Sequence, residues 1–193
     1  MVRNYDPDRP VPGDVVERAL DNAIRAPSAG FSQGWGFLLL DQRSDVDRFW
    51  AAASPEEPTM RGWLAGMTKA PVVVVAHSNK SAYLERYAQP DKGWTDRDEA
   101  RWPAPYWDID TGFASLLILQ TAVDAGLGAC FFGIVPERIA AYKQEFGVPD
   151  GFHPIGAITI GHPAPDARSA SLKRGRRSTS EVVHRGAWQA PDH

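Results

Sequence analysis

Two groups of side chains in this sequence have types and positions that could support chemistry. The first is a set of arginines near the two ends of the chain, Arg3 at one end and Arg174 and Arg176 at the other. A guanidinium group can bind two phosphate oxygens at once, so this set could hold a phosphorylated ligand. The second group is aromatic and includes seven tryptophans. Flat rings can line the site of a flat ligand, but they also fill ordinary cores, so their number alone decides nothing.

Other catalytic arrangements do not match the spacing that their chemistry requires. The five histidines are scattered, and none pairs with another or with Cys130 at metal-ligand spacing. Ser115 falls inside a helical pattern, whereas a hydrolase nucleophile stands on a strand-to-helix elbow. Gly126, Gly128 and Gly133 follow a predicted helix and miss the dinucleotide-binding spacing. We therefore expect no metal site, no catalytic side chain, and a cofactor that brings the reactivity.

Composition places the chain among ordinary globular proteins. Its 193 residues suit a single domain, 1–193, or one subunit of an intertwined oligomer. A formal net charge of −3 gives no reason to expect nucleic acid or an acidic membrane surface as a partner. The one cysteine, the lack of an apolar leader and the lack of an uninterrupted apolar run of about 20 residues predict a cytoplasmic protein without a membrane segment.

Hydrophobic periodicity predicts a mixture of helices and strands rather than a regular βαβ alternation. Asp14 is the predicted N-cap of the first helix, and Gly126 and Pro136 suit the end of one later helix and the start of the next. The longest helix is apolar on most sides and is expected to be central. The predicted helices cover 15–25, 45–53, 108–125 and 136–146, and the predicted strands cover 36–40, 71–76 and 154–160.

Two segments stand apart from this pattern. Residues 78–107 are charged and aromatic together, which suits a lid-like or partner-covering excursion, or else a surface helical hairpin without a binding role. Residues 164–193 form a basic and weakly patterned C-terminal tail. The basic tail has two open interpretations, a phosphate-binding segment and a solvated surface.

Four segments, in order along the chain, resemble the FMN-binding nitroreductase family. Each motif is weakly specific alone, and the four together span nearly the whole chain. They are Val2-Arg3-Asn4-Tyr5-Asp6, then 26–37 (APSAGFSQGWGF), then 106–133 from YWDID to GLGACFFG, then ITIGHP at 158–163 with KRGRR at 173–177. The second segment is the most specific of them.

This resemblance implies an α+β protein with a three-layer α/β/α nitroreductase-like fold, a central and mostly antiparallel sheet, and an intertwined homodimer with FMN at its interface. It also implies cofactor-binding positions. Arg3, Arg174 and Arg176 would hold the flavin phosphate and Asn4 the adjoining chain of the cofactor. Main-chain groups of Pro27, Ser28 and Ala29, together with Gln33, would approach the edge of the ring, and a backbone N–H at Phe132 and Gly133 would face flavin N5.

The sequence also departs from the family pattern. The family often carries a further basic residue and a serine before the position of Arg3, where this chain has Met1 and Val2. It often has asparagine at the position of Phe31 and proline at that of Gly34. Phe31 is therefore a candidate for the substrate pocket. The other candidates for that pocket come from the aromatic excursion and are Trp94, Trp102 and Tyr106.

The function implied is an FMN-dependent oxidoreductase that uses NAD(P)H in a ping-pong reduction of nitroaromatic or quinone-like acceptors. Two alternatives stay open. One is a flavin-dependent dehydrogenase or oxidase of a peptide- or amino-acid-derived substrate, and the other is a flavin-binding protein without catalytic activity. The sequence does not distinguish NADH from NADPH.

Overall fold

The computed structural model describes residues 1–56, 64–166 and 170–188. Its strands are β1 (Trp35–Leu40), β2 (Val72–Ser78), β3 (Gly128–Phe132) and β4 (His153–Gly161). Its α-helices are α1 (Gly13–Ala23), α2 (Arg43–Ala53), α4 (Lys80–Tyr87), α5 (Tyr106–Asp124), α6 (Pro136–Phe146) and α7 (Thr179–Val182). Short 3₁₀ turns are η1 (Ala29–Phe31), η2 (Met67–Lys69), η3 (Glu99–Arg101) and η4 (Ala170–Arg174).

The four strands form one antiparallel sheet in the order β1-β2-β4-β3. β2 and β4 are central, and every residue of β2 is buried. Consecutive side chains of a strand point to opposite faces, so β2 contributes to two cores. Val72 and Val74 belong to the core under α1 and α5, while Val73 and Val75 belong to the core shared with α2 and α6.

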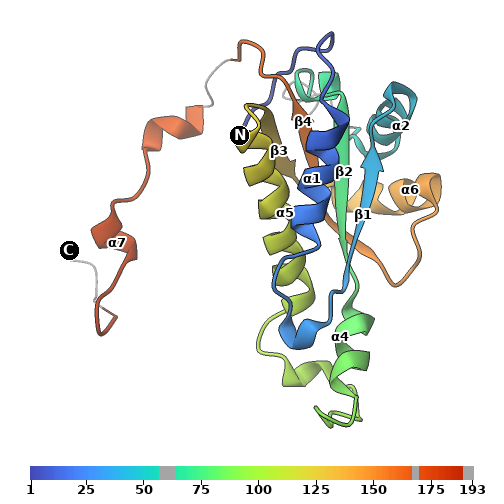
Figure 1. Cartoon of the computed structure of the whole chain (residues 1–193), viewed down its shortest axis with the longest axis vertical. Coiled ribbons are helices and arrows are strands. Elements are labelled where there is room, and N and C mark those ends of the chain that lie inside the picture. The colour runs from blue at the N-terminus through green and yellow to red at the C-terminus, as the bar shows by residue number, and fades with distance from the viewer. Residues whose placement is uncertain (57–63, 167–169, 189–193) are drawn as a thin grey trace.

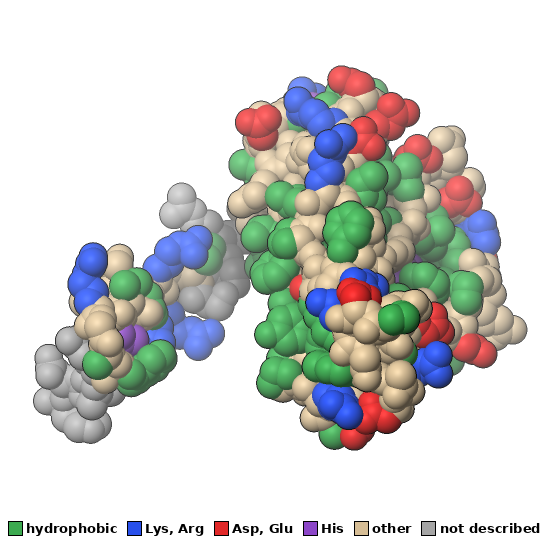
Figure 2. Space-filling model, turned by 60° about the horizontal axis from the view of Figure 1, so that its bottom comes forward, with side chains coloured by type: hydrophobic (Ala, Val, Ile, Leu, Met, Phe, Trp, Pro, Cys, Tyr) green, Lys and Arg blue, Asp and Glu red, His purple; other side chains and the backbone are tan. Residues whose placement is uncertain are grey.

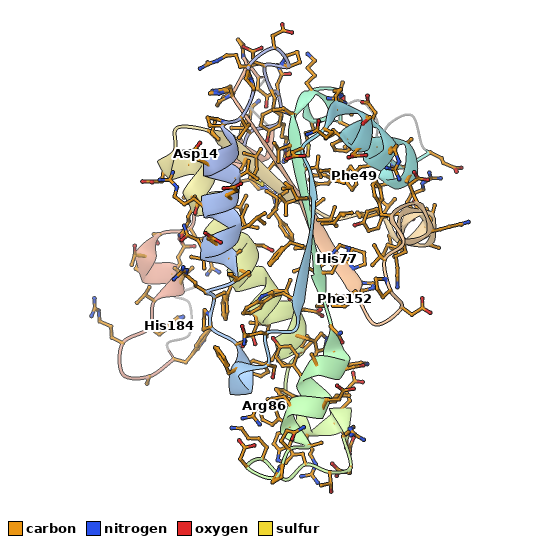
Figure 3. The ribbon with its side chains drawn as sticks, turned by 45° about the vertical axis from the view of Figure 1, so that its right-hand side comes forward. Asp14, Phe49, His77, Arg86, Phe152 and His184 are labelled. Carbon is orange, nitrogen blue, oxygen red and sulfur yellow. The ribbon has the colours of Figure 1, made fainter. Side chains whose placement is uncertain are left out.

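The result is a three-layer arrangement, with α1 and α5 on one face of the sheet and α2 and α6 on the other (Figure 1). This confirms the predicted α+β class and the predicted antiparallel character of the sheet. Figure 3 shows Phe49 and His77 on the side of the sheet that α2 and α6 cover. Arg86 lies at the far end of the molecule, on α4.

The sequence prediction missed one strand and misplaced one helix cap. The strand β3 was not predicted because its five residues begin with Gly128 and lack a clear alternation. The prediction for the N-cap of α1 was wrong. The helix starts at Gly13, Pro12 occupies the cap position, and Asp14 lies exposed in the first turn without a capping bond. Proline can occupy that position because it fixes an extended entry and needs no hydrogen-bond partner for its nitrogen.

The long helix α5 packs against α1 and the sheet on its inner side. Its outer side carries hydrophobic residues that are exposed in the single chain. Phe113, Leu116 and Val123 are 46%, 48% and 67% exposed, and their spacing places them on one side of the helix. The helix is therefore central to the core on one face only, and its apolar sequence is explained only in part by the packing of one chain.

The C-terminal segment leaves the body after it passes beside the N-terminus. Tyr5 pairs with Pro163, and Asn4 Nδ2 donates to the Pro165 carbonyl at 2.7 Å. Beyond this point the chain runs away from the three layers (Figure 1). Figure 2 shows this tail beside the body, with basic and hydrophobic side chains on its surface. Residues 167–169 and 189–193 of the predicted tail lie outside the described residues.

Candidate functional site

The turn between α1 and β1 has an unusual backbone. Gly30, Phe31 and Gln33 all have positive φ, at 61°, 56° and 50°. Left-handed backbone is uncommon in side-chain-bearing residues, and for a bulky residue such as Phe it is an outlier. Such strain tends to gather at ligand sites. Phe31 is also 76% exposed, so its ring is not stabilised by burial in this chain.

Side chains within the turn fix its shape. The Gln33 N–H donates to Ser28 Oγ at 3.1 Å, and Ser32 Oγ donates to the Ala29 carbonyl at 2.7 Å. The Gln33 side chain is exposed. The turn therefore keeps the small residues Pro27, Ser28 and Ala29 exposed or half-buried at the surface, while several of its main-chain groups are bonded within the chain.

The N-terminal residues lie at the other end of the body. Val2 N–H donates to the Ala129 carbonyl at 3.1 Å, which attaches the chain start to β3. Arg3 is half-buried beside Cys130. Burial raises the pKa of the Cys130 thiol, and the nearby Arg3 only partly opposes this effect. Cys130 therefore remains a neutral thiol near pH 7 and is not a poised nucleophile.

Sequence analysis did not single out Lys69, which adds a cation near Arg3. Its Nζ lies 3.5 Å from Asn4 Oδ1, at the end of η2. Gly66, just before η2, has no room for a side chain because a Cβ there would overlap the Arg3 carbonyl. This close approach brings η2 and its lysine to the N-terminus. A lysine three residues before the buried valine strand is the only signal in the sequence, and it is a weak one.

Phe132 is the last residue of β3, and Gly133 follows it directly. The Phe132 ring stacks on Trp50, with centroids 5.4 Å apart and an interplanar angle of 7°. A Cβ at Gly133 would meet no atom within 4 Å, so open space lies in front of this backbone. The anchored ring at 132 and the open backbone at 133 fit a flat group placed against the strand end.

The tail carries the remaining predicted residues. Arg174 and Arg176 are exposed and, with Gly175, Arg177 and Glu181, line a hollow of about 480 Å³. Arg177 pairs with Glu181 at 3.7 Å. Within the described ranges no carboxylate lies within ion-pair distance of Arg174 or Arg176. A single chain does not bring these two arginines to Arg3, because the tail extends away from the body (Figure 1).

The aromatic residues of 78–107 pack on one another. Trp102 contacts Tyr83, Tyr87, Trp94, Tyr106 and Trp107, with ring centroids 4.5 to 6.1 Å apart. Ion pairs Lys80–Glu99 at 2.6 Å and Arg101–Asp96 at 2.6 Å lie around this cluster. Predicted pocket residues Trp94, Trp102 and Tyr106 therefore lie together, and they form a packed cluster at the α4 end of the molecule.

Two groups of the predicted cofactor residues, the 27–33 turn and the N-terminal pair Arg3 and Asn4, lie at opposite ends of α5. Ala29 N–H donates to Asp110, near the start of the helix, while Val2 binds Ala129, just after its end. Fourteen residues of helix separate Asp110 from Asp124, which corresponds to roughly 21 Å at 1.5 Å per residue. One chain thus keeps the 27–33 turn well apart from Arg3 (Figure 1).

Among the described residues, none of the helices has the length and hydrophobicity that a membrane-spanning segment requires. No group of three or more His, Cys, Asp or Glu side chains in the same ranges is arranged to hold a metal ion.

Comparison with known proteins gives a match over most of the chain. A model of the nitroreductase family matches residues 1–162. The chain belongs to the nitroreductase family. A relative from Methanothermobacter thermautotrophicus is 26% identical over 173 residues, covering 89% of this chain and 76% of the relative. It is named "Putative NADH dehydrogenase/NAD(P)H nitroreductase".

This nitroreductase family member shares its fold with solved structures. A nitroreductase family protein from Clostridium difficile 630 superposes with a TM-score of 0.68 at 21% identity, over 97% of this chain and 94% of that one. NfrA1 from B. megaterium gives a TM-score of 0.74 at 16% identity, over 100% of this chain and 72% of that one. At these identities the likeness establishes the fold alone.

Proposed function

We propose that this nitroreductase family chain is an FMN-dependent oxidoreductase that takes electrons from NAD(P)H and passes them to a flat acceptor of the nitroaromatic or quinone type. The observation that carries the proposal is the 27–33 turn. It lies in the segment most specific to the family, its backbone is strained, and its residues 27–29 are exposed or half-buried at the surface. The names of relatives that include NAD(P)H nitroreductase and NADPH-dependent oxidoreductase support the choice of electron donor.

The site is proposed to form between two copies of the chain. The turn and the Arg3 region lie at opposite ends of α5, so a homodimer in which two α5 helices run side by side can place the turn of one protomer near the basic end of the other. The exposed stripe Phe113, Leu116 and Val123 gives such a dimer an apolar contact. The extended tail would then pack on the partner, which explains why its side chains are exposed in one chain.

The described residues fit the chemical parts of FMN. Its phosphate carries about two negative charges, as phosphate monoesters do near neutral pH. Arg3, Arg174 and Arg176 would supply the fixed cations, and Asn4 and Lys69 lie beside Arg3. The turn at 27–29 and the exposed Gln33 would contact the ring edge. Gly133, which follows Phe132 and whose backbone faces open space, would offer an N–H to the ring. When bound, FMN supplies the transfer of hydride from NAD(P)H and of electrons to the acceptor.

The protein's other part in the reaction is to shape the space over the ring. The exposed Phe31 ring is free to contact a flat acceptor, and the cluster around Trp102 lies against the same turn through Tyr87. Packed rings lose little conformational freedom on binding, so they suit a pocket wall. No side chain is assigned a proton-transfer role, because solvent can supply the protons that the acceptor gains.

One observation favours a second candidate. Phe31 replaces a polar family position and projects an apolar ring from the turn. This suits a flavin-dependent dehydrogenase or oxidase of a peptide- or amino-acid-derived substrate. Steady-state oxidation of NADH and NADPH with a quinone distinguishes the two. Turnover supports the reductase, whereas a yellow protein with no turnover contradicts it.

The phosphate assignment has a direct test. The double variant Arg174→Glu/Arg176→Glu should weaken FMN binding at least tenfold, because it replaces two attractive charges by repulsive ones. Arg185→Glu is the matched control, since it changes the charge of the same tail away from the hollow at 174–177. Dissociation constants come from titration of apoprotein with FMN. Equal weakening by the control, or none in the double variant, would contradict the assignment.

A further inference from the structure

Asp110 is a buried carboxylate that the proposed chemistry leaves without a role. It is only 3% exposed and lies near the start of α5. Its Oδ2 accepts two hydrogen bonds, one from Tyr83 Oη at 2.8 Å and one from the Ala29 N–H at 2.8 Å. Burial, together with the neighbouring Asp110, raises the pKa of the fully buried Tyr83, so this hydroxyl stays protonated and donates.

The hydrogen bond from the Ala29 N–H to Asp110 is made within the strained turn. Ala29 comes directly before Gly30 and Phe31, which have positive φ, and Gln33 completes the left-handed set. Strained backbone persists only where the surroundings over-determine it. A hydrogen bond from a peptide N–H to a carboxylate is stronger than one to a neutral acceptor, and here it is partly buried. Asp110 is therefore well suited to fix the Ala29 peptide plane.

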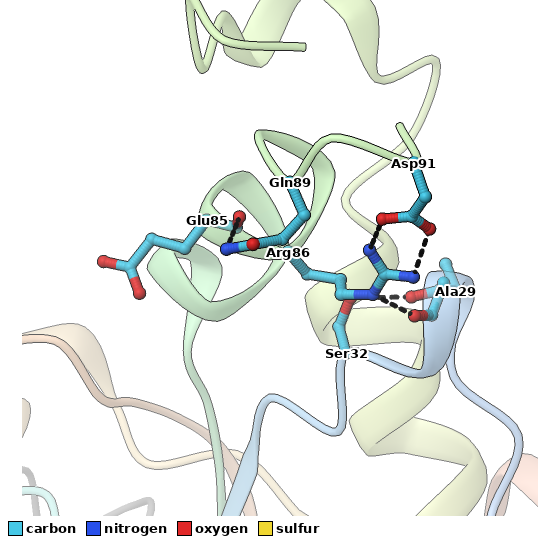
Figure 4. A network of polar contacts seen from close by, with 7 residues as sticks. Ala29, Ser32, Glu85, Arg86, Gln89 and Asp91 are labelled. Carbon is cyan, nitrogen blue, oxygen red and sulfur yellow. Dashed lines mark hydrogen bonds and ion pairs between the residues drawn. The ribbon is translucent and has the colours of Figure 1, made fainter. Parts of the chain in front are cut away.

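Helix α4 closes the other side of the turn. Arg86 Nε donates to the Gly30 carbonyl at 2.8 Å, while its terminal nitrogens bind both oxygens of Asp91 (Figure 4). A Cβ at Gly34 would lie 2.6 Å from Tyr83 Cε2, so the chain also contacts the Tyr83 ring directly. The Asp110 oxygen thus joins three elements, the turn, α4 and α5, at one point.

We propose that Asp110 is a positioning residue for the flavin ring, acting through the Ala29 peptide. It would not touch the cofactor. It would set the direction in which the main chain of residues 27–29 faces the ring edge, while the Tyr83 hydroxyl donates the second hydrogen bond to Asp110. This inference rests on the proposed function and adds to it a residue that determines how the ring is held.

The full-length protein offers a graded test with a matched control. Asp110→Asn can place its amide oxygen where Oδ2 lies and keep both bonds, but as a neutral and weaker acceptor. Asp110→Ala removes the acceptor altogether. Asp108→Ala is the control, because Asp108 lies on the same helix and accepts from Ser78 Oγ at 2.6 Å without reaching the turn. The readouts are the FMN dissociation constant, the visible circular dichroism of the bound flavin at saturation, and Tm.

We expect Asp110→Asn to weaken FMN binding about fivefold and Asp110→Ala tenfold or more, both with a changed visible circular dichroism. Asp108→Ala should lower Tm and leave both flavin readouts unchanged. Wild-type flavin readouts in Asp110→Asn, which preserves the shape of the side chain, would overturn the inference. So would equal changes in the Asp108 control, which would indicate a general effect on α5. A wild-type protein that binds no FMN would overturn the proposed function itself, which separates that failure from this one.

Discussion

At the scale of single residues, local sequence predicts some contacts of a side chain much better than others. The surroundings of His77 make it a structural residue. It is 4% exposed, its Nε2 lies 2.9 Å from the Tyr142 hydroxyl, and its Nδ1 lies 3.3 Å from the Gly36 carbonyl. Both bonds are made by a neutral imidazole that donates through Nδ1–H and accepts at Nε2. By contrast, local sequence pattern indicates Lys69 only weakly and Asp110 not at all, because both contacts join residues far apart in the chain.

His77 predicts a pH dependence of stability. Burial lowers the pKa of its imidazole in the folded state, so the unfolded chain binds the proton more readily. The stability from neutral His77 is complete above the unfolded pKa of about 6.5 and is lost as the pH falls below it. The free energy of unfolding should therefore decrease from pH 7 to 5.5, by at most about 1.4 kcal/mol per pH unit from this one site.

Denaturant titrations at several pH values check this expectation. His77→Gln is the comparison, because it retains polar atoms but does not titrate. The slope between pH 7 and 5.5 should be smaller in the variant than in the wild type. Identical slopes would show that other groups cause the pH dependence.

At the scale of elements, periodicity predicted most of the helices and strands, and it did so because each had one clear cause. The four valines of 72–75 made β2 evident, and Pro136 and the left-handed Gly126, with φ of 72°, marked the helix ends as expected. The strand β3 was missed because it is held by pairing with β4, and a local sequence pattern does not reveal pairing with a distant strand. The backbone of 30–33 was likewise hidden, since left-handed Phe31 and Gln33 contradict local preference.

The contact between the turn and α4 predicts a difference between two glycine variants. Gly30 and Gly93 both have positive φ, so alanine at either position is strained. At Gly30 the new Cβ would also lie 2.6 Å from Tyr87 Cε2, whereas at Gly93 it meets nothing within 4 Å. Gly93→Ala should therefore cost about 1 kcal/mol of stability and Gly30→Ala about 2 kcal/mol or more.

Equilibrium unfolding of the two variants measures this difference. Gly30→Ala should also weaken FMN binding, because it displaces the turn, and Gly93→Ala should not. If the two variants lose the same stability and bind FMN alike, the turn is not held against Tyr87 as described.

At the scale of the whole molecule, the single chain explains its layers but not its surface. The proposed dimer would account for three features: the apolar stripe on α5, the extended tail with exposed Val182 and Trp188, and the separation of the 27–33 turn from Arg3. The family resemblance implied such a dimer. Composition and periodicity could not, because an interface helix and a core helix share the same apolar pattern.

Leu116→Glu tests the dimer proposal. In a two-fold interface the substitution introduces the charge twice, and each buried leucine contributes about 1.5–3 kcal/mol. The variant should sediment as a monomer and lose FMN, since the site is proposed to need both chains. Ser44→Glu, exposed on α2 at the opposite side, is the control and should remain dimeric. A Leu116→Glu dimer of wild-type affinity would contradict the proposed interface.

The central claim is that this chain binds FMN and exchanges electrons with NAD(P)H. The visible spectrum of the purified protein, supplemented with FMN, freed of excess and then treated anaerobically with NADH or NADPH, tests it most directly. We predict retained flavin bands that bleach on addition of at least one of the two nicotinamides and return with a quinone. A protein that stays colourless after FMN addition would contradict the account.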